Sequence, residues 1–469
     1  MSTSVAAAVA AELASIRVKG PVLQPGADGF AAAAKTQLKT PYLATQPALI
    51  FCPTCTQDVV AAVKAACRHG MELSVKGGGH SVVSAGLCNG LVIDLSGMRD
   101  IQVEPTEHVA MVEGGALMGD IDAATVPHGL AAALGQCPKV GLGSALSGGG
   151  YGFASRAFGS IAANILSAEM VTADGEVVQV DDTTPELLWA FRGAGAAFGV
   201  VTRIQLRLHD LAGYLGGIMI WPDDPTHTNF RAAATWMRDV GYQVADFGMQ
   251  LGHRTAKDGS FVMGFIHHPG SRTALQQKHA LLSSLRSVAQ PLQDTTAEGP
   301  SSYMATQGFL ESQKPPNRPA QYQHWTGGAL MRNQVTPAWL NALVAEFDRR
   351  PPACAAADVL VMLDFLGGRI KEADGPIGFK NFDLACYHLT SWLDDSRTDE
   401  LVASQRQWKT SMQAFLTLEC YANMVSEDEE SRVAVRVGGD ANLMRLRALK
   451  ASLDPNNVFR HHHFQGLVA

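Results

Sequence analysis

The sequence predicts an α+β protein built from two closely packed domains. A chain of 469 residues is longer than a single hydrophobic core of ordinary size supports. Its composition, 46% hydrophobic and 17% charged, is typical of a well-buried globular protein and argues against disorder. Three clusters of its 46 glycines lie between residues 77 and 199, where they interrupt regular structure and create loops that a ligand can approach closely.

The first domain begins with short apolar strands that alternate with helices. Hydrophobic periodicity and end signals predict these elements: a strand at 48–51, a helix at 54–70 with a capping box of Thr54 and Gln57, a strand at 73–75, strands at 91–95 and 109–113, and a helix at 117–128. An alternating strand at 201–208 closes this domain. We therefore expect a first domain at 1–212, made of an N-terminal helix, 1–39, and a core, 40–212.

The remaining chain has a different character, with fewer glycine loops. A polar helical stretch at 276–301 and apolar strands such as 359–364 predict a second domain, 213–420, with an antiparallel sheet covered by helices. The last segment, 421–469, contains a predicted helix at 441–453 that ends at Asp454-Pro455, and a predicted short strand at 458–459. We expect this segment to return to the first domain.

Charge and hydropathy exclude several classes of partner. The net charge is −7 and no cluster of lysine and arginine stands out, so we expect no nucleic-acid binding. No apolar run is long enough to span a membrane. The first 16 residues lack a basic start and contain Glu12, which favours a surface helix over a signal peptide. We expect a cytoplasmic monomer, or a secreted protein if a signal was removed.

The eight cysteines are scattered, and Cys52 and Cys55 form the one CxxC motif. This pair is compatible with a redox dithiol or with half of a zinc site. No second pair of cysteines or histidines at ligand spacing accompanies it. We therefore interpret both residues as packed thiols at a junction between a strand and a helix, and we predict no metal.

The glycine clusters match none of the common nucleotide fingerprints. The cluster at 193–199 misses GxGxxG by one residue, and the sequence contains no GK[ST] for a P-loop. Three glycine loops in one domain still indicate backbone amides gathered around an anionic or flat ligand, such as a diphosphate-linked cofactor. By residue chemistry alone, the protein is an enzyme with a nucleotide-type cofactor of unspecified identity.

Five motifs in a fixed order narrow this interpretation. They are KGGGHS at 76–81, QCPKVG at 136–141, SGGGYG at 147–152, TADG at 172–175 and WAFRG at 189–193. Together they resemble the FAD-binding domain of the vanillyl-alcohol-oxidase-type (p-cresol methylhydroxylase-type) flavoproteins, in the branch similar to the berberine bridge enzyme. The likeness spans 42–208 and resumes at 421–423 and 454–460. It implies a two-domain flavoprotein in which two α/β subdomains bind FAD.

The resemblance implies two covalent bonds to FAD, from His80 to the flavin 8α carbon and from Cys137 to flavin C6. It places the diphosphate and ribityl contacts on Gly77, Gly78, Gly79, Ser81, Gly148 and Gly149, and the adenosine end near Gly193, Gly199 and Val201. Val140, Gly141, Ser144 and Gly152 complete the expected cofactor-binding residues. Two departures concern the flavin surroundings: Ser144-Ala145 stands where many relatives have Gly-His, and HHHF at 461–464 replaces an asparagine-rich strand. Neighbours on a strand alternate faces, so a metal at these histidines is disfavoured.

The resemblance also supplies candidate catalytic residues. Tyr421, in Tyr421-x-Asn423, is similar to a tyrosine that lies over the flavin as a base, and Asp364 to a carboxylate beside it that takes the proton in relay. A tyrosine with a pKa of about 10 needs such help at neutral pH. Val140 stands where the family gates oxygen access, and a small valine there favours an oxidase.

These residues predict an FAD-dependent oxidase with a small-molecule substrate and O₂ as its partners. Hydride would pass from an alcohol or hemiacetal carbon to flavin N5, and reoxidation by O₂ would give H₂O₂. The expected substrate is the reducing end of a mono- or oligosaccharide, which would become a lactone. Two alternatives stay open: an oxidase of a secondary metabolite such as an alkaloid, a polyketide or an aromatic alcohol, and a flavin-loaded resistance protein that sequesters a small molecule.

Overall fold

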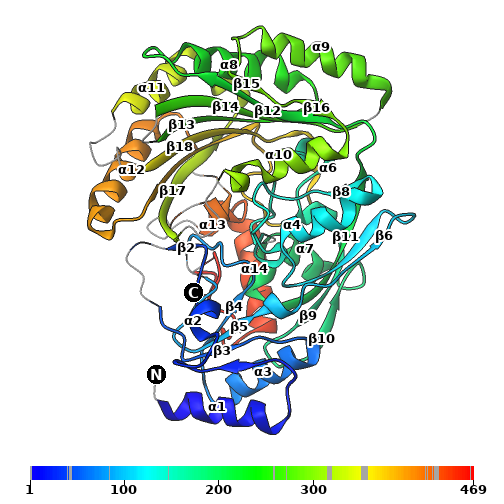
Figure 1. Ribbon diagram of the computed structural model, residues 1–469. Helices are drawn as coiled ribbons and strands as arrows, with labels where there is room; N and C mark the ends of the chain where they lie inside the picture. The colour runs from blue at the N-terminus through cyan, green and yellow to red at the C-terminus, as the bar shows by residue number, and fades with distance from the viewer. Residues whose placement is uncertain are drawn as a thin grey trace.

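The computed structural model describes residues 3–39, 41, 45–83, 85–145, 147–256, 259–270, 272–313, 319–349, 357–417, 419, 421–424, 426, 433–464 and 466–468, with the side chains of 3, 144, 145, 256 and 273 left out. Three β-sheets organise the molecule (Figure 1). Two of them form the lower, N-terminal domain, and the third forms the upper domain with its helices. The predicted α+β fold, with an antiparallel second-domain sheet, is confirmed.

The first sheet is a small parallel sheet with one antiparallel edge strand. Its order is β1 (Val22–Leu23), β3 (Leu49–Phe51), β5 (Leu91–Asp94) and β4 (Leu73–Lys76). Helices α3 (Thr56–Arg68) and α1 (Thr3–Ser15) share its apolar core. The expected N-terminal helix, 1–39, is wrong beyond Ser15, because the chain then forms β1, the short α2 (Phe30–Ala33) and β2 (Leu38–Lys39).

The start of α3 also differs from the predicted capping box. The carboxylate of Asp58, rather than Gln57, accepts hydrogen bonds from the backbone N–H groups of Thr54, Lys19 and Gly20. Cys55 is the N-cap and offers no side-chain hydrogen bond to the helix. Cys52 and Cys55 are free thiols between β3 and α3, and burial raises the pKa of Cys52 to about 11. This is the packed-thiol arrangement.

The second sheet is antiparallel. Its order is β10 (Val177–Val180), β9 (Ile165–Val171), β11 (Val200–Asp210), β7 (Val109–Glu113) and β6 (Ile101–Glu104), and β8 (Leu130–Ala132) also pairs with β11. The helices of this part are α4 (Met118–Thr125), α5 (Leu142–Ala145), α6 (Ser155–Phe158) and α7 (Pro185–Ala194). The connections between these elements contain the QCPKVG motif at 136–141 and the SGGGYG motif at 147–152. The second sheet therefore positions both motifs near the KGGGHS motif of the first sheet.

The third sheet has the order β15 (Gln293–Asp294), β12 (Leu215–Pro222), β14 (Gly259–His268), β13 (Gly248–Ala256), β18 (Asp358–Phe365), β19 (Leu384–Trp392), β17 (Gln321–Leu330) and β2, with β16 (Ala297–Glu298) beside β12. Figure 1 shows its outer face covered by α8 (Thr228–Asp239), α9 (Leu275–Arg286), α11 (Pro337–Asp348) and α12 (Thr398–Met412). Helix α10 (Pro300–Ser312) lies toward the first domain. The predicted helical stretch at 276–301 is therefore helical in its first half, and α10 begins at its end.

Strand β2 comes from the N-terminal segment but pairs in parallel with β17 at the edge of the third sheet. The C-terminal segment crosses in the other direction: after α13 (Val433–Arg436), α14 (Asp440–Leu453) packs on α7. Arg445 pairs with Glu186, and Lys450 donates to the carbonyl of Ala197. The strand expected at 458–459 is instead an irregular turn. The carboxylate of Asp454 holds it by accepting hydrogen bonds from the backbone N–H groups of Val458 and Phe459.

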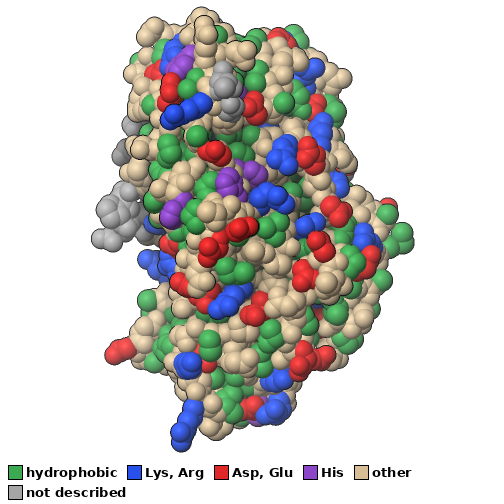
Figure 2. Space-filling view, turned by 90° about the vertical axis from the view of Figure 1, so that its right-hand side faces the viewer, with side chains coloured by type: hydrophobic (Ala, Val, Ile, Leu, Met, Phe, Trp, Pro, Cys, Tyr) green, Lys and Arg blue, Asp and Glu red, His purple; other side chains and the backbone are tan. Residues whose placement is uncertain are grey.

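Charges of both signs are mixed on the face that Figure 2 displays. Figure 2 shows lysine and arginine side chains interspersed with aspartate and glutamate over the displayed face, without a basic stripe. Among the helices that the structure describes, none combines the length and the apolar character that crossing a membrane requires.

Candidate active site

Two adjoining cavities lie at the glycine loops. The first cavity is bounded by β4, the 77–81 loop and the 459–463 segment. The second cavity, of about 230 Å³, lies between the 135–140 loop and the inner face of the third sheet. Both include His80, Ser81 and His463 in their walls, so the two spaces form one elongated site.

The structure brings many of the predicted residues to these walls. The first cavity is lined by Gly77, Gly79, His80, Ser81, Gly199 and Val201. The second is lined by His80, Ser81, Cys137, Val140 and Tyr421. His80 and Cys137 lie on loops separated by β5 to β8 in the chain, yet both face the second cavity. The two residues that the resemblance assigns to flavin attachment thus line the same cavity.

Local hydrogen bonds hold the Cys137 loop against helix α4. The N–H groups of Met118 and Gly119, at the start of α4, donate to the carbonyls of Val140 and Pro138 at 2.9 Å each. The loop also touches the KGGGHS motif: a Cβ on Gly78 would stand 2.3 Å from the carbonyl oxygen of Lys139. Only glycine permits this approach, which brings the two motif loops into contact.

The other predicted glycines have contacts that explain them by packing. Gly78 and Gly141 abut each other, and a Cβ on Gly152 would collide with the carbonyl of Leu134. Gly148 and Gly149 have φ of +92° and +94°, with the Tyr421 ring and Ile377 next to them. The carbonyl of Gly193 accepts from the Gly148 N–H. None of these glycines lines either cavity, so their expected contacts with FAD stay predictions. The side chain of Ser144 lies outside the described residues.

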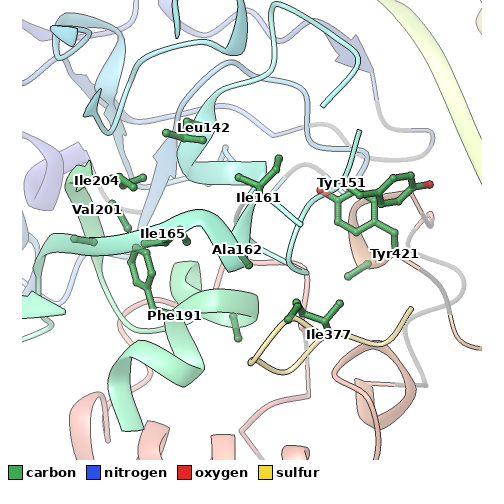
Figure 3. Close-up of a cluster of buried hydrophobic side chains, with 14 of the residues drawn as sticks. Leu142, Tyr151, Ile161, Ala162, Ile165, Phe191, Val201, Ile204, Ile377 and Tyr421 are labelled. Carbon is green, nitrogen blue, oxygen red and sulfur yellow. The ribbon is translucent and has the colours of Figure 1, made fainter. Parts of the chain in front are cut away.

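Tyr421 packs against a second tyrosine, Tyr151 of the SGGGYG motif. Their ring centroids are 5.4 Å apart, and Figure 3 shows the two rings side by side with the hydroxyl oxygens at opposite ends of the pair. The Tyr421 hydroxyl accepts a hydrogen bond of 3.1 Å from Asn423 Nδ2. Its backbone N–H donates to the hydroxyl of Tyr387. Both tyrosines line the second cavity.

Asp364 lies behind Tyr151, at the end of the buried strand β18. Its Oδ2 accepts 2.7 Å from the Tyr151 hydroxyl, and its Oδ1 accepts 2.6 Å from Gln250 Nε2. Burial raises the pKa of Asp364 to about 6, while these two hydrogen bonds oppose the rise. We expected Asp364 beside Tyr421; its hydrogen bonds to Tyr151 and Gln250 show that it contacts the cavity through Tyr151.

Burial raises the pKa of Tyr421 as well, and the hydrogen bond from Asn423 opposes that rise. The phenol is therefore neutral at physiological pH. A neutral phenol accepts a proton only as another group takes its own, or as charge develops near it. Proton transfer at Tyr421 therefore depends on polar neighbours such as Asn423, which donates to its hydroxyl oxygen.

The three histidines at 461–463 line the first cavity, where the chain bends rather than forming a strand. The expected alternation of faces is therefore wrong, because it assumed an extended strand. Burial lowers the pKa of His462 to about 3 and that of His463 to about 4, so both rings are neutral. His462 Nδ1 accepts from the Phe464 N–H, and His463 Nε2 lies 3.4 Å from Ser81 Oγ.

The first cavity fits the phosphate and ribose part of FAD. Ser147 Oγ is buried in its wall without a hydrogen-bond partner among the described residues, so it offers a donor to a bound oxygen. Lys76, also in the wall, is neutralised by Asp94 at 2.8 Å. Because the charge of Lys76 is already balanced by Asp94, the backbone N–H groups of the glycine loops would bind the anionic phosphates.

The second domain contributes a largely apolar wall that sequence reasoning missed. Leu360, Met362 and Leu389 point into the second cavity from β18 and β19, with Trp325 and Gln323 from β17. Trp325 Nε1 donates to Gln323 Oε1 at 3.2 Å, which fixes the indole. Alternation along these strands predicts two faces, but only the paired sheet shows which face meets the cavity. Tyr151 was missed because its motif reads as a glycine loop.

Two segments of this chain match known protein families. Residues 47–181 match the family described as FAD binding domain, and residues 420–463 match berberine and berberine like. A 6-hydroxy-D-nicotine oxidase from Arthrobacter nicotinovorans has a crystal structure similar to this one, with a TM-score of 0.83, 25% identity, and coverage of 96% of this chain and 98% of that chain.

Curated relatives are similar at moderate identity. An (R)-6-hydroxynicotine oxidase from Paenarthrobacter nicotinovorans is 36% identical over 234 residues, which are 49% of this chain and 50% of the relative, so that match spans about half of each protein. A xylooligosaccharide oxidase from Thermothelomyces thermophilus is 27% identical over 435 residues, 88% of this chain and 86% of the relative. These matches show an FAD-binding domain and a berberine-like C-terminal segment in this chain, which is similar to FAD-linked oxidoreductases of the berberine-bridge-enzyme-like kind.

Proposed function

We propose that this protein is an FAD-dependent oxidase that takes a hydride from a carbon bearing a hydroxyl group. The observation that supports it is the shared second cavity, where Tyr421 faces the same space as His80 and Cys137. FAD, when bound, would supply the hydride acceptor and the two-electron reduction of O₂ to H₂O₂. His80 and Cys137 would hold the flavin through two covalent bonds, because imidazole and thiolate are side chains able to attack an electrophilic flavin carbon.

Tyr421 would accept the proton of the substrate hydroxyl. It would do so as the phenolate, after its own proton has left to solvent, and would return to the neutral phenol as hydride leaves the substrate. Asn423 donates to the Tyr421 oxygen and so stabilises that phenolate. Asp364 acts through Tyr151: it holds the ring on which Tyr421 packs, and its charge lies behind that ring. Asp364 is therefore a positioning residue in this proposal, and Tyr421 is the catalytic one.

The wall of the second cavity bears on the substrate. An oligosaccharide carries hydroxyl groups on most carbons, and each buried one needs a partner. The described wall opposite the flavin side offers Gln323 and Glu311 beside Leu38, Leu310, Leu360, Met362 and Leu389. Glu311 is already paired with Lys139. We therefore propose a compact, mostly apolar alcohol, such as an aromatic or heterocyclic secondary metabolite, that stacks on Trp325.

The sugar substrate is the competing candidate, supported by the name of the xylooligosaccharide oxidase relative. Peroxide release from a panel of aromatic alcohols, hydroxylated heterocycles, monosaccharides and oligosaccharides separates the two. Turnover of the cyclic apolar alcohols, with kcat/KM at least tenfold above every sugar, supports our proposal. Preference for oligosaccharides would overturn the substrate class while leaving the oxidase intact.

A sequestering role makes a different prediction. A flavin-loaded binding protein needs no proton acceptor, so Tyr421→Phe would leave its ligand affinity and any slow flavin reduction unchanged. An oxidase loses its rate of flavin reduction while it keeps the bound flavin. Anaerobic reduction of wild type and Tyr421→Phe with the best substrate of the panel decides between these roles.

A further inference from the structure

A buried cluster of ligand-type side chains lies in the second domain, outside both cavities. It consists of Asp223, His227 and His253, whose ligand atoms all lie within 4.8 Å of one another, and it is the one such group among the described residues. The side chains are 8%, 7% and 1% exposed, respectively. Asp223 follows β12, His227 precedes α8, and His253 lies on the central strand β13. The connection between β12 and α8 thus meets strand β13 at one point.

The spacing of the ligand atoms suits a small cation. Asp223 Oδ1 lies 3.0 Å from His227 Nδ1, and Asp223 Oδ2 lies 2.7 Å from His253 Nε2. Ligands bound tetrahedrally to Zn²⁺ at about 2.0–2.1 Å stand about 3.4 Å apart. The Asp223 carboxylate would therefore move about 0.4 Å away from His227 Nδ1 and about 0.7 Å away from His253 Nε2 to admit an ion. Side-chain rotation alone supplies such a movement.

His227 is oriented by its backbone and by a second carboxylate. It is the N-cap of α8, in the left-handed conformation with φ of +52°. Its Nδ1 points to Asp223, and its Nε2 lies 3.3 Å from Oδ1 of Asp348, the last residue of α11. When Nε2–H donates to Asp348, Nδ1 carries the lone pair. Metal-binding histidines are commonly oriented by a carboxylate in this way.

Aromatic rings enclose the cluster. The Phe347 ring stacks on the His253 imidazole at 4.0 Å with an interplanar angle of 8°, and it meets the His227 ring edge-on at 5.2 Å. The two imidazoles are nearly perpendicular, at 88°. Such a shell limits water access and lets an ion interact strongly with its ligands. The side chain of Asp348 is 70% exposed, which leaves a route from the surface.

The donor set selects the class of ion. Two imidazole nitrogens and one carboxylate suit Zn²⁺ and the neighbouring first-row transition ions, whereas Mg²⁺ and Ca²⁺ prefer all-oxygen sites. We propose that Asp223, His227 and His253 form a divalent transition-metal site, typified by Zn²⁺, with water as the fourth ligand. The ion would join the β12–α8 connection to β13, and through Asp348 to the end of α11. Its role would be to stabilise the second domain.

The competing interpretation is a metal-free network, in which the Asp223 carboxylate accepts hydrogen bonds from two imidazole N–H groups. That network would satisfy the same distances. The two differ in one measurable property: only the metal site binds Zn²⁺ at one equivalent per chain and gains thermal stability from it.

The test uses the intact flavin-loaded protein. The protein is stripped with a chelator, dialysed against limiting Zn²⁺ with a competing weak chelator, and analysed for zinc by elemental mass spectrometry and for melting temperature. We expect one Zn²⁺ per chain and a melting temperature that rises with Zn²⁺. His227→Asn should lose the bound zinc, because asparagine tolerates the left-handed backbone but lacks the imidazole nitrogen.

Two further variants separate a specific site from surface binding. Asp348→Asn retains all three ligands but weakens the support of His227, so zinc affinity should fall about 10- to 100-fold while the fold persists. His279→Gln removes an imidazole that is 48% exposed on α9. It should leave both the bound zinc and the rise of the melting temperature with Zn²⁺ unchanged. No stoichiometric zinc in the wild type, or equal zinc in wild type, His227→Asn and Asp348→Asn, would overturn the site. If His227→Asn does not fold, the Asp348→Asn result decides.

Discussion

The hydroxyl of Tyr151 donates a 2.7 Å hydrogen bond to the buried carboxylate of Asp364, across 213 residues of chain. This bond joins a glycine loop of the first domain to a central strand of the second, directly beside the cavity. On its other side, the Tyr151 ring packs on Tyr421. The ionisation of one buried carboxylate is thereby connected, through one ring, to the proposed proton acceptor.

Tyr151→Phe should shift the pH dependence of turnover. The pKa of Asp364 is already raised to about 6, and the Tyr151 hydrogen bond holds it from rising further. Without that bond the pKa rises by about one unit, since a hydrogen bond to a charged group is worth about 1.5–3 kcal/mol. The acidic limb of the kcat profile should therefore move to higher pH. Gln250→Leu should move it in the same direction, and Asp364→Asn should remove it; an unmoved limb in all three would show that Asp364 does not influence the reaction.

Tyr421→Phe should slow flavin reduction by about 10²- to 10⁴-fold, the usual contribution of a general base. The ring and its packing on Tyr151 persist, so flavin content and melting temperature should stay near those of the wild type. Stopped-flow absorbance under anaerobic conditions measures the rate. Tyr322→Phe, a matched change on strand β17, should leave the rate unchanged. A full rate in Tyr421→Phe would assign proton removal to another group.

Attachment of the flavin can be tested by acid precipitation. The wild type and the single variants His80→Ala and Cys137→Ala should each retain the yellow chromophore in the pellet, and the double variant should release it. The reason is that either bond alone anchors the ring. Cys67→Ala, at an exposed cysteine, serves as the control. Release from the wild type would mean that FAD is held without covalent bonds, and release from one single variant would assign a single attachment point.

Asp122→Asn should change how stability depends on pH. Asp122 on α4 accepts a hydrogen bond from Tyr303 of α10, and burial raises its pKa to about 7. A raised carboxyl pKa favours the protonated folded form, so its contribution to stability is complete below about pH 4 and is lost as pH rises through about 7. The wild type should therefore lose on the order of 2–4 kcal/mol of unfolding free energy over this window from this group.

Asp122→Asn removes that loss, since the amide oxygen still accepts from Tyr303 and carries no charge. The variant should gain on the wild type from about pH 4 to about pH 7 and then keep a constant advantage, as followed by melting temperature. Glu107→Gln, at an exposed turn, should track the wild type throughout. Parallel pH profiles for Asp122→Asn and the wild type would contradict a buried, protonated carboxyl at this position.

Much of the fold was predictable because its signals are local. The strand at 109–113 and the helix at 441–453 follow from periodicity and end signals that lie within the segments themselves. The failures share a cause. The N-terminal helix beyond Ser15 and the strand at 458–459 were judged from composition, whereas β2 is set by pairing with β17 and the turn at 458–459 by the carboxylate of Asp454.

The sequence by itself determined the likeness to FAD-binding flavoproteins and the loops that carry His80 and Cys137, because glycine motifs dictate backbone conformation over a few residues. The tertiary structure decided what surrounds them. Asp364 meets Tyr151 rather than Tyr421, Trp325 and Leu360 line the second cavity, and Asp223 meets His253 only because elements far apart in the chain pack together. Contacts between distant elements depend on sheet pairing and side-chain direction, and neither is encoded in any one segment.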